Sequence, residues 1–184
     1  VTMPAVKEYA LSNQLPVYQP AHMRGEEALE LLRRLNPDLS VIAAYGQILP
    51  EEIISLPRLG SINVHASVLP KYRGAAPINR AILNGETETG VTIMRVAKKL
   101  DAGDIIRVAR TPIGPDEDAV ELFSRLAALG AGLLSETIPT LADGSARFQP
   151  QDESEATYAA MLSRELSAID WSKGAEQIYC QVRA

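Results

Sequence analysis

The stretch EEALELLRRLNPDLSVIAAY, residues 26–45, predicts a helix, a turn and a buried strand in succession. Its first ten residues place apolar side chains on one face of a helix and mostly charged side chains on the other. Asn36-Pro37 stops this helix, because the residue before a proline is disfavoured in the helical region. Residues 39–45 then form a nearly continuous apolar run, which is typical of a strand in a parallel sheet. This succession indicates an α/β fold.

The same alternation continues on both sides of this stretch. We expect helices at 4–14, 50–56, 77–83, 118–141, 158–166 and 173–182, and strands at 15–18, 61–65, 91–96 and 105–110. Asp118 suits the start of the long helix, and Gly144 follows its end. Residues 146–155 are polar, so we expect them to cross the surface. The elements together predict a mainly parallel sheet flanked by helices.

The composition favours a folded domain in the cytoplasm. The chain has 184 residues, 46% hydrophobic and 22% charged, which is enough material for a core. No apolar run approaches the ~18–20 residues that cross a bilayer, and the first residues lack the order of a secretory signal. One cysteine and two histidines argue against a disulfide framework and against a metal site. A net charge of −5 argues against a stand-alone nucleic-acid binder, and we expect neither a DNA nor a membrane partner.

The predicted strand SINVH, residues 61–65, carries the first candidate site residues. Its period of two places the side chains of Asn63 and His65 on the same side. His65 also ends the strand, and ligands of open α/β sheets bind beyond the carboxyl ends of strands. A lone histidine at a strand end is more commonly a structural residue. The loop that follows His65 shifts the interpretation toward a functional role.

That loop, HASVLPKYRG at residues 65–74, resembles the HxSLLPxxxG signature of the folate-dependent formyltransferases. It departs from the signature at Val68, where a leucine is usual. Residues 44–50 (AYGQILP), 73–78 (RGAAPI), 90–94 (GVTIM) and 169–172 (IDWS) resemble the members of this family that act on methionyl-tRNA. The resemblance covers essentially the whole chain.

The resemblance implies a Rossmann-like fold that moves a formyl group from 10-formyltetrahydrofolate to the amino group of methionyl-initiator tRNA. The positions that match the family's catalytic residues are Asn63, His65 and Asp101. The segments that match its folate site supply further candidates, namely Ser67, Val68, Leu69, Pro70, Gln47, Ile48 and Leu49. It also implies that residues 1–145 are a catalytic domain without its first βα unit. Residues 146–184 would then lead toward a C-terminal domain, with the main tRNA-binding parts outside this chain.

The chemistry of formyl transfer also favours an asparagine, a histidine and an aspartate in the site. Attack of an amine on the formyl carbon creates an oxyanion and a surplus proton. The amide of Asn63 can donate to the oxyanion, and His65 can donate to it or manage the proton. A carboxylate beside the imidazole would hold its tautomer and favour its charged form, and Asp101 is preferred over Asp104 for this role.

Several alternatives stay open. For Ile48 and Leu49, packing in the core is as good an interpretation as ligand contact. The same catalytic centre would serve a sister enzyme that formylates a nucleotide sugar or phosphoribosylglycinamide, and the chain could also be a folate-binding fragment without activity. The sequence contains no glycine-rich phosphate loop, so a nucleotide cofactor is not supported.

Overall fold

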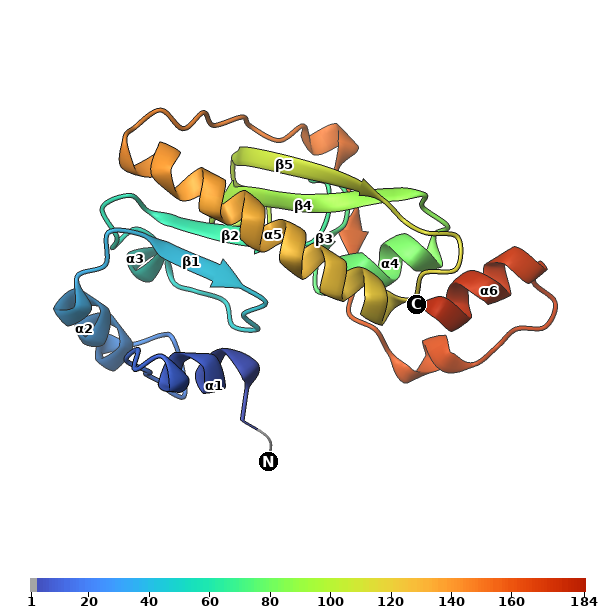
Figure 1. Cartoon of the computed structure of the whole chain (residues 1–184), viewed down its shortest axis with the longest axis horizontal. Coiled ribbons are helices and arrows are strands. Elements are labelled where there is room, and N and C mark those ends of the chain that lie inside the picture. Colours follow the sequence, from blue (N-terminus) through green and yellow to red (C-terminus); the bar gives the residue numbers. More distant parts are fainter. Residues whose placement is uncertain (1–2) are drawn as a thin grey trace.

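A four-stranded sheet with the order β1-β2-β4-β5 organises the chain, of which the computed structural model describes residues 3–184 (Figure 1). Its strands are β1 (Ser40–Ala43), β2 (Ser61–His65), β4 (Glu88–Arg95) and β5 (Ile105–Pro112). The α/β class is confirmed. However, only β1 and β2 run parallel, and β4 is antiparallel to both β2 and β5. The sheet is therefore mixed and not mainly parallel, since residues 96–104 are too few for the crossover that would make β4 and β5 parallel neighbours.

Helix α5 (Ala119–Ala142) covers one face of this sheet, as Figure 1 shows. Its start is fixed by a capping box, in which the Asp118 carboxylate accepts from the N–H of Glu121 and the Glu121 carboxylate accepts from the N–H of Asp118. The helix lies close to the strands, because a Cβ atom on Gly130 would be 3.1 Å from Val64 and 3.4 Å from Val91. Val64 thus faces α5, so the neighbouring side chains along β2 face the opposite side of the sheet.

The other elements surround the ends of the sheet. The helices are α1 (Ala5–Ser12), α2 (Glu26–Leu35), α3 (Glu51–Ile54), α4 (Pro77–Leu83) and α6 (Ala175–Arg183), with 3-10 turns η1 (Glu153–Glu155) and η2 (Arg164–Ser167). These helices confirm the predictions at 4–14, 26–35, 50–56, 77–83 and 173–182 within a few residues at each end. A second, two-stranded sheet pairs β3 (Arg73–Gly74) with β6 (Tyr158–Ala159) in parallel.

Two predictions about local structure are wrong, and a third is confirmed only in part. Residues 15–18 form no strand, because they have no strand partner among the described residues and Pro16 lacks a hydrogen-bond donor. Residues 158–166 form no α-helix, because Tyr158 and Ala159 pair with β3 instead. The strand expected at 39–45 is confirmed at residues 40–43 and is parallel to β2. It is not buried as predicted, with Val41 42% exposed, because β1 lies at the edge of the described sheet.

Candidate active site

His65 lies at the centre of the candidate site with its ring buried at the end of β2. Its Nε2 atom is 2.8 Å from the backbone carbonyl oxygen of Tyr72. A carbonyl oxygen can only accept a hydrogen bond, so Nε2 carries a proton. The lone pair of the neutral ring is then on Nδ1, which lies 3.7 Å from Oδ2 of Asp101. This separation is too long for a hydrogen bond, yet it is close enough to stabilise an imidazolium.

The Tyr72 carbonyl, and not Asp101, therefore fixes the tautomer of His65. Tyr72 is held in turn by its own contacts: its backbone N–H donates to Oγ1 of Thr157 at 2.9 Å, and its hydroxyl donates to Glu86 at 2.7 Å. Burial, together with this bond to Glu86, raises the pKa of the Tyr72 phenol. The role of a backbone carbonyl group cannot be recognised from the pattern of side chains in a sequence. The contact between the Tyr72 carbonyl and His65 was therefore not predicted.

Asp101 reaches His65 because the loop of residues 96–104 folds back over the face of the sheet opposite α5. The backbone N–H of Gly74 donates to its Oδ2 atom at 2.8 Å. The loop lies against the end of β4, where a Cβ atom on Gly103 would be only 2.0 Å from the carbonyl oxygen of Arg95. Asp104 has a different place. Its carbonyl oxygen accepts from the N–H of Arg95 at 2.9 Å, and no hydrogen bond or ion pair to its carboxylate is found among residues 3–184.

Asn63 shares the face of β2 on which His65 lies. It is half-buried and is paired in register with Met94, whereas His65 is paired with Thr92. Within the described part of the chain, no residue forms a hydrogen bond with its side-chain amide. Both amide N–H groups are therefore available to a ligand. The structure brings Asn63, His65 and Asp101 to one face of the sheet.

The loop after His65 is held by a threonine. The hydroxyl of Thr92 donates to the carbonyl oxygen of Ser67 at 2.7 Å and accepts from the N–H of Leu69 at 3.1 Å. The Ser67 hydroxyl donates to the carbonyl oxygen of Lys71 at 2.6 Å. Ser67 and Leu69 are buried, whereas Val68 and Pro70 are half-buried. Only the latter two offer side-chain surface to a ligand.

The loop of residues 44–50 leaves the same edge of the sheet, because β1 and β2 are parallel and Ala43 is paired with Val64. Gln47 is fixed by the segment of residues 21–23. Its side-chain amide accepts from the N–H of Met23 at 2.9 Å and donates to the carbonyl oxygen of Ala21 at 3.3 Å. The two neighbours differ in environment. Leu49 packs against the small core of Ala28, Leu29 and Ile53, whereas Ile48 is 92% exposed. Core packing therefore holds for Leu49 and not for Ile48.

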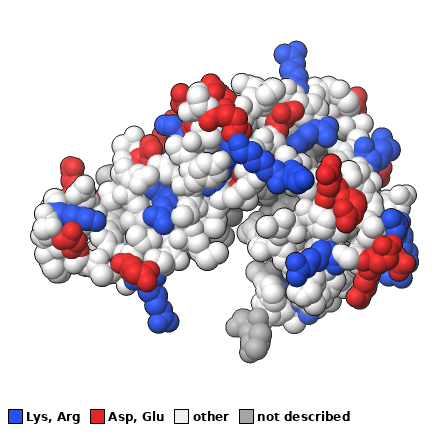
Figure 2. Space-filling model, turned by 180° about the vertical axis from the view of Figure 1, so that it is seen from behind, with Lys and Arg blue, Asp and Glu red and all other residues white. Residues whose placement is uncertain are grey.

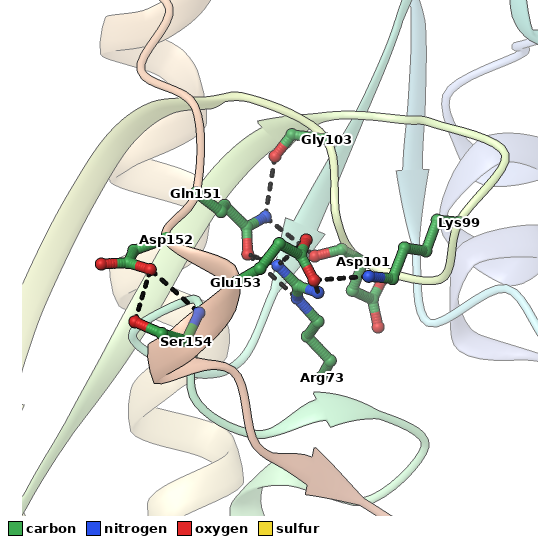
Figure 3. A network of polar contacts seen from close by, with 8 residues as sticks. All are labelled: Arg73, Lys99, Asp101, Gly103, Gln151, Asp152, Glu153 and Ser154. Atoms are coloured by element: carbon green, nitrogen blue, oxygen red, sulfur yellow. Dashed lines mark hydrogen bonds and ion pairs between the residues drawn. The ribbon is translucent and has the colours of Figure 1, made fainter.

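A polar network that the sequence did not predict surrounds Arg73, which is fully buried (Figure 3). Its guanidinium donates to Oε1 of Gln151 at 2.8 and 3.0 Å and to the carboxylate of Glu153 at 3.0 and 3.2 Å. Burial acts to lower the pKa of Arg73, but its hydrogen bonds more than offset this, so that pKa is raised. The bonds from Arg73 and Lys99 lower the pKa of Glu153 to about 2. The segment around residue 151 thus belongs to the site and does not merely cross the surface.

Other features of the described residues lie away from this constellation. A cavity of about 470 Å³ opens at the opposite end of the strands, where β2 begins at Ser61 and β4 ends at Arg95.

On the face seen in Figure 2, cationic and anionic side chains are interspersed without a continuous area of either sign. Within residues 3–184 no group of three or more histidine, cysteine, aspartate or glutamate side chains is placed to hold a metal ion. None of the described helices is both long and apolar enough to cross a bilayer.

Comparison with known proteins agrees with the resemblance. Residues 2–138 match the model of a family described as formyl transferase. The chain is 52% identical over 180 residues to the methionyl-tRNA formyltransferase of Dictyoglomus turgidum, which covers 97% of this chain and 57% of that protein. It is 49% identical over 183 residues to the same enzyme of Staphylococcus aureus, which covers 100% of this chain and 59% of that protein. The chain thus spans less than two thirds of these curated relatives.

Among solved structures, the chain is similar to WlaRD, a sugar 3N-formyltransferase crystallised in the presence of dTDP and 5-N-formyl-THF. The TM-score is 0.76 and the sequence identity 25%, and the match covers 97% of this chain and 61% of that one. The overall fold of this chain is therefore similar to that of a structure solved in the presence of a formylated folate.

Proposed function

Because the chain belongs to the formyl transferase family, we propose that it transfers the formyl group of 10-formyltetrahydrofolate to the amino group of methionyl-initiator tRNA. The observation that carries this proposal is the buried His65–Asp101 pair on the face of β2 that also presents the unpaired amide of Asn63. The relatives from D. turgidum and S. aureus, which act on methionyl-tRNA by name, support the choice of acceptor. We include in this proposal the cytoplasmic location that is expected from the composition.

The geometry gives each group a distinct role. As the methionyl nitrogen bonds to the formyl carbon, the carbonyl oxygen becomes an oxyanion, to which Asn63 donates. The attacking nitrogen must lose a proton, and Nδ1 of His65 is the ring position that can take it because Nε2–H is already bonded to the Tyr72 carbonyl. The imidazolium that forms is stabilised by Asp101. The proton then passes to the folate nitrogen as its bond to the formyl carbon breaks.

We propose that the folate lies against the two loops that leave the carboxyl ends of β1 and β2. In the loop of residues 66–70, Val68 and Pro70 offer side-chain surface, and Ser67 and Leu69 keep the loop in shape. In the loop of residues 44–50, the exposed Ile48 offers an apolar contact for a flat ring, while Gln47 and Leu49 anchor the loop to the protein. The structure solved in the presence of 5-N-formyl-THF supports a folate donor.

A sister reaction on an amino sugar nucleotide is the second candidate, favoured by the similarity to WlaRD. The test supplies 10-formyltetrahydrofolate and offers methionyl-initiator tRNA, a dTDP-linked amino sugar or phosphoribosylglycinamide in separate reactions. Transfer to the tRNA supports the proposal, and transfer to the sugar nucleotide or to phosphoribosylglycinamide instead overturns it. Binding of the donor in calorimetry without transfer to any acceptor would show a folate-binding fragment without activity.

Substitutions of Asn63 and His65 test the roles proposed for these two residues. Asn63→Ala and His65→Ala should each lower turnover by about 10²–10³-fold with the fold intact. The double variant should lose far less than the product of the two effects, because both residues act on one transition state. Circular dichroism serves as the control for folding. A folded single variant that keeps near-normal turnover would exclude that residue from catalysis.

A further inference from the structure

We propose that Gln151 is a positioning residue, which holds the loop carrying Asp101 so that its carboxylate faces His65. This inference builds on the proposed function, in which Asp101 stabilises the imidazolium. Gln151 lies between α5 and β6, 50 residues from Asp101 in the sequence. Nothing in the family resemblance or in the sequence pattern points to it.

The side-chain amide of Gln151 uses all of its hydrogen-bonding groups. Its Nε2 atom donates to the carbonyl oxygen of Asp101 at 2.8 Å and to that of Gly103 at 2.7 Å. Its Oε1 atom accepts two bonds from Arg73. Because carbonyls only accept and a guanidinium only donates, the orientation of the amide is unambiguous. The amide therefore ties two carbonyl groups of the loop to a buried cation, as Figure 3 shows.

These contacts close a ring that includes the catalytic carboxylate. Arg73 is followed by Gly74, whose backbone N–H donates to Oδ2 of Asp101. The ring thus runs from Asp101 through Gln151 and Arg73 to Gly74 and back to Asp101. Arg73 is an immobile anchor, because moving it would leave a buried charge without its partners. Gln151 is the member that joins this anchor to the backbone of the loop.

The loop needs such an external support. Asp101 has a φ of 46°, in the left-handed region that is uncommon for residues other than glycine. The preceding Leu100 is 59% exposed, and Lys98 and Lys99 are exposed as well, so this part of the loop has no anchor in the core. Among the described residues, the bonds from Gln151 and Gly74 hold the Asp101 backbone and carboxylate directly, whereas the Lys99 side chain joins the loop to Glu153.

The test compares Gln151→Met and Gln151→Glu with Asp152→Asn. Methionine keeps the length of the side chain without its hydrogen bonds. Glutamate keeps a bond to Arg73 but presents an oxygen to the two loop carbonyls. The control residue Asp152 is an exposed neighbour whose carboxylate accepts from the N–H and hydroxyl of Ser154, and in Figure 3 this carboxylate points away from the network.

Two readouts are measured on the folded chain. The first is hydrogen exchange at the amide of Gly74, whose acceptor is the Asp101 carboxylate. We expect exchange to be about tenfold faster or more in both Gln151 variants and unchanged in the control. The second is steady-state formyl transfer, in which kcat should fall by about tenfold or more while the KM for 10-formyltetrahydrofolate changes less than about twofold.

Hydrogen exchange at Gly74 can be measured in a protein that has no activity. A failure of this inference can therefore be distinguished from a failure of the proposed function. Exchange of Gly74 at the wild-type rate in Gln151→Glu overturns the positioning role, whatever the activity. An equal rise of exchange in Asp152→Asn would also overturn it, because the effect would then belong to the segment as a whole. If Gln151→Met does not fold, Gln151→Glu carries the test, since it keeps the bond to Arg73.

Discussion

A methyl group on Gly103 would lie 2.0 Å from the carbonyl oxygen of Arg95 and 2.8 Å from its carbon. Real Cβ atoms essentially never come closer than 3.0 Å, so Gly103→Ala must push the loop away from β4 by about 1 Å or more. Such a shift costs about 1–3 kcal/mol for overpacking. It also weakens the bond between Arg95 N–H and Asp104, at 2.9 Å, and the bond from Gln151 to Gly103, at 2.7 Å, each contributing about 1 kcal/mol.

We therefore expect Gly103→Ala to lower the free energy of unfolding by about 2–4 kcal/mol. In a chain of 184 residues this corresponds to a fall in Tm of about 5–15 °C. Urea and thermal unfolding followed by circular dichroism measure the effect. The variant should also lose formyl transfer even where it is fully folded, because Asp101 is two residues away in the same loop.

Gly132→Ala is the matched control, because Gly132 lies within α5 and a Cβ atom there meets nothing within 4 Å. Alanine should stabilise the helix by about 0.5–1 kcal/mol, so the two glycine substitutions should have opposite signs. If Gly103→Ala unfolds at the wild-type urea concentration, the close approach of the loop to β4 is not a constraint on the protein, and the reasoning fails.

Three further predictions concern charge and packing. Asp101→Asn removes the charge 3.7 Å from His65 that stabilises the imidazolium of the transition state, so transfer should fall by about 10²–10³-fold. Asp104→Asn should leave the rate close to that of the wild type, and the reverse ranking would identify the wrong carboxylate. Leu126→Ala, at a residue only 2% exposed, should cost about 2–5 kcal/mol in urea unfolding, whereas calorimetry should show unchanged donor affinity in the folded protein. A stable variant that lost donor binding alone would show that this side chain lines the ligand site. Hydrogen bonds from the neighbouring guanidinium and ammonium groups lower the pKa of Glu153 from 4.5 to about 2, so this carboxylate stabilises the fold above about pH 4.5 and that contribution disappears as the pH falls toward 2. The difference in unfolding between the wild type and Glu153→Gln should shrink over this range, and a difference that stays constant from pH 6 to pH 2 would contradict the assignment.

Elements specified by local chemistry were predicted well. The strand at 61–65 and the helix at 77–83 have the predicted bounds, and α5 begins after Asp118, as its capping residue indicates. In each case the deciding signal lies within a few residues of the element, such as an apolar period, a proline at the first turn or a capping side chain. Such signals need no knowledge of the rest of the chain.

Features set by distant partners were not predicted. Residues 158–159 join β3 because of pairing across the chain, and strand direction within the sheet depends on how the chain returns. In the candidate site, the alternation along β2 was enough to place Asn63 and His65 on one face, whereas Asp101 was found by family resemblance. The Tyr72 carbonyl and the amide of Gln151 act through backbone bonds or over long separations, so no local pattern reveals them.

The ring that joins residues 73–74, 101–103 and 151 also sets the order in which the site is completed during synthesis. Domains begin to fold while the chain is being made, and the strands of the main sheet and α5 all lie within residues 40–142. Arg73, however, finds its partners 78 and 80 residues later, and β3 waits for β6. When the chain has emerged from the ribosome only as far as residue 145, Arg73 is therefore still without these partners. The carboxylate is set against the imidazole only when the following segment emerges, so a nascent chain assembles most of its core before it completes the candidate site.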